Sequence, residues 1–176
     1  MSDDAARVRL RDVALADADL IDAWNRDPER SEYNDFGEPF SPLPRAVLKR
    51  GPLRDHGNGM LLIERVGDGA LIGTIGWHRV QYGPNRESDA WNIGIELRPE
   101  YRGQGLGSEA QRLLAAWLFE NTPANRVEAS TDVENAAEQR ALEKAGYIRE
   151  GIQRGAQFRA GRYRDLVTYS RLREDP

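Results

Sequence analysis

The fold of this chain is decided by residues 91–108, which read Trp91-Asn92-Ile93-Gly94-Ile95-Glu96-Leu97-Arg98-Pro99-Glu100-Tyr101-Arg102-Gly103-Gln104-Gly105-Leu106-Gly107-Ser108. The first seven residues have the apolar, β-branched character of a strand, and Pro99 ends it because proline cannot donate to a ladder. A loop with three glycines in five positions follows. Apolar residues at helical spacing then predict a long amphipathic helix starting near Leu106, with Leu113, Leu114, Trp117 and Leu118 on its apolar side.

A strand, a glycine loop and a helix in succession are suited to binding a phosphate. Glycine permits positive φ and close approach of the backbone, and the free N–H groups and dipole of the first helical turn attract an anion. Arg102 places a cation at the mouth of this loop. The predicted phosphate contacts are Arg102, Gly103, Gln104, Gly105, Leu106, Gly107 and Ser108. A tight strand–helix turn that binds nothing would have the same local pattern.

Two other nucleotide motifs do not fit. The dinucleotide pattern G-x-G-x-x-G requires glycine where Ser108 stands, and the G-x-x-x-x-G-K-[ST] loop requires a lysine after Gly107. Arg102, Gly105 and Gly107 instead match Arg-x-x-Gly-x-Gly. Here the sequence resembles the GNAT superfamily of acetyl-CoA-dependent N-acetyltransferases, whose pyrophosphate signature is [QR]-x-x-G-x-[GA].

The composition limits the classes of protein that remain. We expect a single domain over residues 1–176, with enough length for a core. A net charge of -4 gives no support to nucleic-acid binding, which usually needs a basic surface. The absence of cysteine excludes disulfides, thiolate metal sites and a cysteine acyl-enzyme, and we expect no metal.

Targeting signals are also missing from the sequence. The longest apolar run, Leu113 to Phe119, is too short to span a bilayer, and the acidic start Met1-Ser2-Asp3-Asp4 does not resemble a signal peptide. We therefore expect a cytoplasmic protein without a membrane partner. The sequence leaves open whether it is a monomer or a homodimer.

Periodicity predicts the remaining elements. The expected strands are 8–13, 60–66, 70–80, 91–97, 126–131, 147–151 and 163–172, and the expected helices are 16–26, one from Ser41-Pro42 through Leu48, one from Leu106, and 135–144. Residues 31–44 and 153–162 are predicted to be connections. This order is similar to that of the GNAT fold. The resemblance implies an α/β architecture with a mixed, mostly antiparallel sheet of six to seven strands, about four flanking helices and a splay at the central strand.

A second block extends the resemblance. Asp132-Val133-Glu134-Asn135 and Leu142-Glu143-Lys144-Ala145-Gly146-Tyr147 look like the family's second conserved helix, which implies that Asn135 and Lys144 contact the cofactor. The ending Glu150-Gly151, Gly161 to Asp165 and Tyr169-Ser170 is similar to the branch that acetylates the N-termini of ribosomal proteins (RimJ/RimL-type). In the family, the backbone of the strand before the glycine loop pairs with the pantetheine arm, which here implies Ile95, Glu96 and Leu97.

The catalytic groups are less defined. The tyrosine that many GNAT members use to protonate the thiolate is replaced by Leu142. Glu96, a carboxylate in an apolar strand, is the candidate base, because burial would raise its pKa into a useful range. Glu138 and Asn135 are further catalytic candidates; a solvated surface charge and a helix N-cap are their structural alternatives. Weaker candidates are Glu87, Asp89, His78 and His56.

The acceptor is expected to be an amine. In this family it is held by the first two helices, their loop and the last hairpin, which here carry Trp24, Tyr33, Phe36, Trp77, Tyr82 and Phe158, with Asp35 and Glu38 as acidic partners. Aromatic and acidic groups together suit a cation, and they equally suit a loop anchored by its aromatic side chains. Three functions remain: acetylation of a protein or peptide α-amine, acetylation of a small amine such as an antibiotic or polyamine, and a catalytically idle acyl-CoA-binding module.

Overall fold

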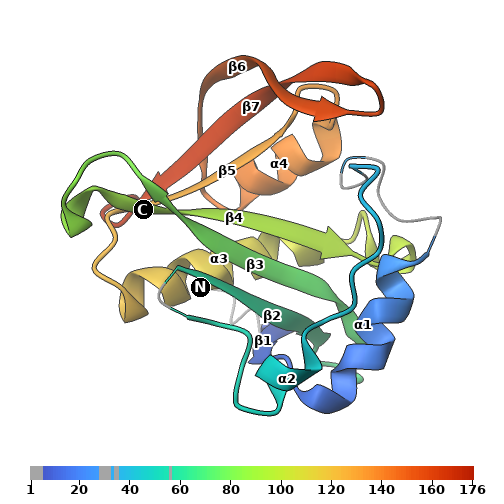
Figure 1. Ribbon diagram of the computed structural model, residues 1–176. Helices are drawn as coiled ribbons and strands as arrows, with labels where there is room; N and C mark the ends of the chain where they lie inside the picture. Colours follow the sequence, from blue (N-terminus) through green and yellow to red (C-terminus); the bar gives the residue numbers. More distant parts are fainter. Residues whose placement is uncertain (1–5, 28–32, 34–35, 56) are drawn as a thin grey trace.

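The computed structural model describes residues 6–27, 33, 36–55 and 57–176, which form one seven-stranded sheet with helices on both faces (Figure 1). The strands are β1 (Val8–Asp12), β2 (Asn58–Arg65), β3 (Leu71–Gln81), β4 (Asp89–Leu97), β5 (Arg126–Asp132), β6 (Ile148–Arg159) and β7 (Arg162–Leu172). The α-helices are α1 (Ala18–Asn25), α2 (Arg45–Leu48), α3 (Leu106–Asn121) and α4 (Ala136–Lys144). None of these described helices is both long and apolar enough to cross a lipid bilayer.

The sheet is splayed at its centre. Its order is β1-β2-β3-β4-β5-β7-β6, and every neighbouring pair is antiparallel except β4 and β5. These two strands pair only at Trp91 with Val127 and at Asn92 with Glu128. Beyond those pairs they diverge into a V that opens at their carboxyl ends (Figure 1). The predicted mixed, mostly antiparallel and splayed sheet is confirmed.

Strand alternation sorts the side chains to two layers. Leu62 of β2 packs under α1 and α2 with Val13, Ile21 and Leu48. Its neighbours Leu61 and Ile63 face the other layer, where the main core lies under α3. Leu114 and Leu118 of α3 are fully buried there, so truncating either to alanine is expected to cost about 2–5 kcal/mol.

Two predicted boundaries are wrong. The second helix does not begin at Ser41-Pro42; α2 is a single turn with Pro44 at its N-cap. Prolines at 42 and 44 disfavour helical conformation in the residues before them, which keeps this segment extended until Arg45. The connection predicted at 153–162 is largely strand, since β6 continues to Arg159.

The β6–β7 hairpin turns at Ala160 and Gly161, which both have positive φ (50° and 75°), as tight hairpin turns require. Alternation is weak in β6 because this edge strand is exposed along most of its length and carries two register shifts. A strand with little buried face does not show the apolar–polar period that would reveal it.

Candidate active site

The glycine loop leads from the end of β4 into α3 as predicted. Gly103 and Gly105 have φ of 71° and 78°, a region that side chains rarely adopt, and α3 begins at Leu106. In the described hydrogen-bond network, no acceptor takes the backbone N–H groups of Leu106, Gly107 or Ser108. These donors and the N-terminal end of a 16-residue helix form a cradle for an anion.

Side chains on both flanks hold this loop in place. Arg102 Nε donates to the Leu97 carbonyl (2.9 Å), which ties the loop to the end of β4. On the other flank Arg7 donates to the Gln104 carbonyl (3.1 Å) and pairs with Glu109 in the first turn of α3 (3.1 Å). The pairing offsets the negative charge of Glu109 close to the cradle.

The cradle stands at the mouth of the V. Ile95, Glu96 and Leu97 lie on the diverging part of β4, where the described β5 residues offer no registered partner. Across the opening, β5 leads into α4, whose N-cap is Asn135. We refer to the opening between the diverging parts of β4 and β5, beside the N-termini of α3 and α4, as the groove; backbone groups and helix N-termini of this kind suit a phosphate-bearing ligand with an extended arm.

The comparisons with known proteins agree with this geometry. A family model described as an acetyltransferase (GNAT) domain matches residues 7–148. The chain belongs to the GNAT acetyltransferase family. Members of this family use acetyl-CoA, and the glycine loop matches their pyrophosphate signature at Arg102, Gly105 and Gly107.

Individual relatives are more distant. The chain is 28% identical over 174 residues to an uncharacterized N-acetyltransferase, p20, of Bacillus licheniformis, covering 96% of this chain and 94% of p20. It is 32% identical over 108 residues to a putative ribosomal N-acetyltransferase, YdaF, of Bacillus subtilis, and the match covers 61% of this chain and 57% of YdaF. Among solved structures, spermidine N-acetyltransferase of Vibrio cholerae with CoA and spermine superposes with a TM-score of 0.77 at 21% identity. The superposition covers 97% of this chain and 98% of the spermidine N-acetyltransferase chain.

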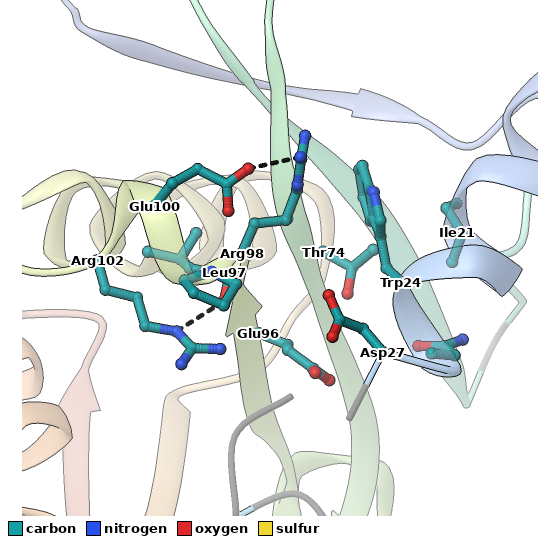
Figure 2. A pocket seen from close by; sticks show the side chains of 12 residues that line it. Ile21, Trp24, Asp27, Thr74, Glu96, Leu97, Arg98, Glu100 and Arg102 are labelled. Carbon is teal, nitrogen blue, oxygen red and sulfur yellow. Dashed lines mark hydrogen bonds and ion pairs between the residues drawn. The ribbon is translucent and has the colours of Figure 1, made fainter. Parts of the chain in front are cut away.

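A cavity of about 350 Å³ lies at the end of β4 on the face covered by α1 (Figure 2). Glu96 pairs with Thr74 in the β3–β4 ladder, so both side chains point to this face, whereas Ile95 and Leu97 point towards the core under α3. Trp24 and Asp27 complete the wall from the end of α1. Figure 2 shows the carboxylates of Glu96 and Asp27 directed into the same space.

Arg98 closes one side of this cavity. Its guanidinium lies 5.3 Å from the Trp24 ring centre and 5.6 Å from that of Tyr101, and it pairs with Glu100 at 2.5 Å. Trp24 is thus in place by a cation–π contact before any ligand binds.

At the start of α4, Asn135 acts as a helix cap. Its Oδ1 accepts from the Glu138 backbone N–H (3.2 Å), and its Nδ2 donates to Thr131 Oγ1 (3.0 Å). The capping alternative is therefore what the structure describes, with one amide hydrogen of Asn135 left over for a ligand.

Glu138 lies between α4 and α3 and is only partly exposed. Desolvation by the surrounding protein raises the pKa of this carboxyl to about 7, while the neighbouring Gln111 amide acts in the opposite direction. Gln111 is 1% exposed, and neither of its polar atoms reaches hydrogen-bond geometry with a described group. The buried hydroxyl of Tyr147 also has no described partner, and the Glu138 charge contributes to raising its pKa, behind desolvation.

The structure relocates several predicted acceptor contacts. Trp77 has the same strand parity as Ile75, so it is buried (6% exposed) and packs against Trp117 with ring centres 5.2 Å apart. Tyr82 follows the end of β3 that pairs with the start of β4, far from the cavity. Tyr33 lies near the start of α4, where its hydroxyl donates to the Glu134 carbonyl (3.4 Å). Phe36 is 48% exposed.

Other candidates also lie away from the cavity. Lys144 ends α4 and is about 13 Å along the helix axis from Asn135. Glu87 and Asp89 lie at the start of β4, at the opposite end from Leu97, and His78 is exposed on β3. Phe158 packs edge-on against Tyr163 at the β6–β7 hairpin. Asp35 and His56 fall outside the described residues, and Glu38 is exposed.

Sequence reasoning missed Asp27, Thr74, Arg98, Gln111 and Tyr147. Asp27-Pro28 and Arg98-Pro99 give the signal of element ends and nothing more. Thr74 has the strand parity that places it beside Glu96, but that pairing depends on a register that the sequence does not contain.

Proposed function

We propose that this protein transfers an acetyl group from acetyl-CoA to the α-amine of a polypeptide N-terminus, by direct attack within a ternary complex. One observation carries the proposal: the phosphate cradle and the cavity adjoin the same strand end, Glu96-Leu97, and Arg102 of the glycine loop also lines the cavity. A cofactor on the α3 side and an amine on the α1 side can meet there.

The chain's residues have separate tasks in this scheme. The N–H groups at the start of α3 hold the pyrophosphate, with Arg102 beside them. Acetyl-CoA supplies the acetyl group and a thiolate leaving group. Glu96, at the end of the cavity, removes the proton of the amine, directly or through a water. Trp24 and Asp27 hold the cationic form of the acceptor as it enters.

Glu138 is the group proposed to return a proton to the thiolate. It lies one helical turn before Leu142 on the face of α4 that packs against α3, and Leu142 occupies the position where many GNAT members carry tyrosine. A carboxyl with a pKa of about 7 is substantially protonated at neutral pH and can donate.

The α-amine is preferred over a lysine-like amine for a chemical reason. An α-amine has a pKa of about 7.7–8.0 and a lysine side chain about 10.4, so the α-amine needs a weaker base to become neutral. A relative described as a putative ribosomal N-acetyltransferase, YdaF, is in line with a protein acceptor. The second candidate is a small polyamine, since the Trp24 ring and three carboxylates, Asp27, Glu96 and Glu100, line the cavity beside two arginines.

An acceptor screen tests this assignment. Release of free thiol from acetyl-CoA is measured with N-terminal peptides, ribosomal proteins, polyamines and aminoglycosides at equal concentration. We expect kcat/KM for the best peptide to exceed that for the best small amine at least about tenfold. A polyamine that wins by that margin would replace the acceptor class. Tight acetyl-CoA binding without turnover on any amine would instead indicate the idle module.

A further inference from the structure

Six polar side chains meet where β4 and β5 separate: Tyr82, Asn92, Arg126, Glu128, Glu150 and Ser170. We call this set the apex clasp. Its members come from the residue after β3 and from β4, β5, β6 and β7. It lies at the closed end of the V, one strand length away from the active site.

Glu128 is the centre of the apex clasp. This carboxylate is 5% exposed, so it needs donors to be tolerated. The Tyr82 hydroxyl and Arg126 Nε each donate to Oε2 at 2.7 Å, and Asn92 Nδ2 approaches Oε1 at 3.5 Å. The last contact crosses directly from β5 to β4.

Arg126 carries the connection to the outer strands. Its two terminal nitrogens donate to the two Glu150 oxygens at 2.6 Å each, and Ser170 Oγ donates to Glu150 Oε1 at 2.7 Å. Such a bidentate pair fixes geometry as well as contributing energy. The arginine holds the pKa of Glu150 well below its usual range, at about 2, so the pair stays charged at physiological pH.

Few backbone hydrogen-bonded pairs hold β4 and β5 together at the closed end of the V. Only two residue pairs join β4 to β5, whereas β3 and β4 share nine. From Asn92 to Leu97 the strand runs about 16 Å, so a rotation of about 4° at the vertex moves its far end by about 1 Å. A displacement of that size at a reacting centre can lower a rate by about 10²-fold.

We propose that the apex clasp sets the opening of the V and therefore the width of the acetyl-CoA groove. Tyr82 and Glu128 are then positioning residues that touch neither cofactor nor acceptor. This inference rests on the proposed function only in naming acetyl-CoA as the occupant of the groove.

The test uses Tyr82→Phe and Glu128→Gln. The first removes one hydroxyl from a largely exposed ring (64%) and is expected to fold. The matched control is Glu64→Gln, because Glu64 is also a buried carboxylate (7% exposed) paired with two arginines, Arg9 and Arg11, but on β1 and β2. It controls for the stability lost with any buried ion pair.

The distance between α3 and α4, whose N-termini border the groove, reports its width. Since the chain has no cysteine, cysteines replacing Arg112 on α3 and Arg140 on α4, both exposed, accept spin labels without other changes. We expect both clasp variants to shift or broaden the α3–α4 distance distribution by about 1–3 Å. We also expect the acetyl-CoA Kd to rise about fivefold or more, with the acceptor KM changed less than about twofold.

Two results would overturn the proposal. One is an unchanged distance distribution in a folded Tyr82→Phe or Glu128→Gln protein. The other is an equal change in Glu64→Gln, which would reduce the effect to general destabilisation. The distance measurement needs no ligand, so it tests the role of the apex clasp even if acetyl-CoA does not bind the unmodified protein. Failure of acetyl-CoA to bind would contradict the proposed function and leave the result on the apex clasp unaffected.

Discussion

At the scale of single residues, the two carboxylates proposed as base and acid have different surroundings. Glu96 lines an open cavity with Asp27 and Thr74 (Figure 2). Glu138 lies between two helices, where desolvation raises its pKa to about 7. The raised pKa suits Glu138 to donating a proton, whereas Glu96 is proposed as the base from its position in the cavity.

Glu96→Gln tests the acceptor role. The amide keeps the shape of the cavity but cannot take a proton, so we expect unchanged acetyl-CoA affinity and a kcat lower by about 10²-fold or more. Steady-state kinetics and calorimetric titration with acetyl-CoA measure these two quantities. Glu87→Gln at the far end of the sheet is the control, and near-native kcat in a folded Glu96→Gln protein would falsify the assignment.

Glu138→Gln has a signature in stability. The folded pKa of about 7 lies above the ordinary 4.5, so the folded protein binds more protons than the unfolded chain between those values. The associated stability is present below about pH 4.5 and lost as pH rises through about 7. Removing the charge should raise the free energy of unfolding at pH 8 by about 1–3 kcal/mol relative to the unmodified protein.

Urea denaturation at pH 5 and pH 8 measures this change. Glu120→Gln, an exposed carboxylate at the end of α3, serves as the control and should move stability little at either pH. A stability difference between Glu138→Gln and the unmodified protein that is the same at both pH values contradicts the desolvation argument.

At the scale of elements, α3 performs two tasks. Its inner face buries Leu114 and Leu118 over the sheet, and its first turn presents the N–H groups of the cradle. The left-handed N-cap, Gly105, joins the two tasks because it alone turns the chain from the loop into the helix. Arg7, the residue before β1, fixes that turn by its hydrogen bond to the Gln104 carbonyl.

Gly105→Val should therefore raise the acetyl-CoA Kd at least about tenfold, because a β-branched side chain is strained at φ 78° and its Cβ would come 3.3 Å from the Arg7 guanidinium. Calorimetric titration of the folded variant measures the change. Gly67→Ala is the control, since nothing lies within 4 Å of its added Cβ and its φ is not positive. An unchanged acetyl-CoA Kd in Gly105→Val would show that the cradle does not bind the pyrophosphate.

At the scale of the whole molecule, the sequence predicts the features that depend on neighbouring residues and misses those that depend on contacts between distant strands. The glycine loop, the start of α3 and the strand before it are local patterns, and the structure confirms them. Trp77 lies two residues after Ile75 on the same side of β3, so strand alternation predicts that it is buried. The hydrogen bond from Tyr82 to Glu128 instead depends on β5 lying beside β4, which the sequence does not show. The cavity brings together α1, β3 and β4, which no single stretch of sequence encodes.

The chain has no cysteine, and the cradle and the cavity meet at one strand end, so the acetyl group is expected to pass directly to the amine without an acetyl-enzyme. Incubation with radiolabelled acetyl-CoA and no acceptor, followed by denaturation and gel filtration, should leave the protein unlabelled. Kinetics with two varied substrates should give intersecting rather than parallel double-reciprocal lines. Stoichiometric label that survives denaturation, together with parallel lines, would place a serine or another oxygen nucleophile on the path and overturn direct attack.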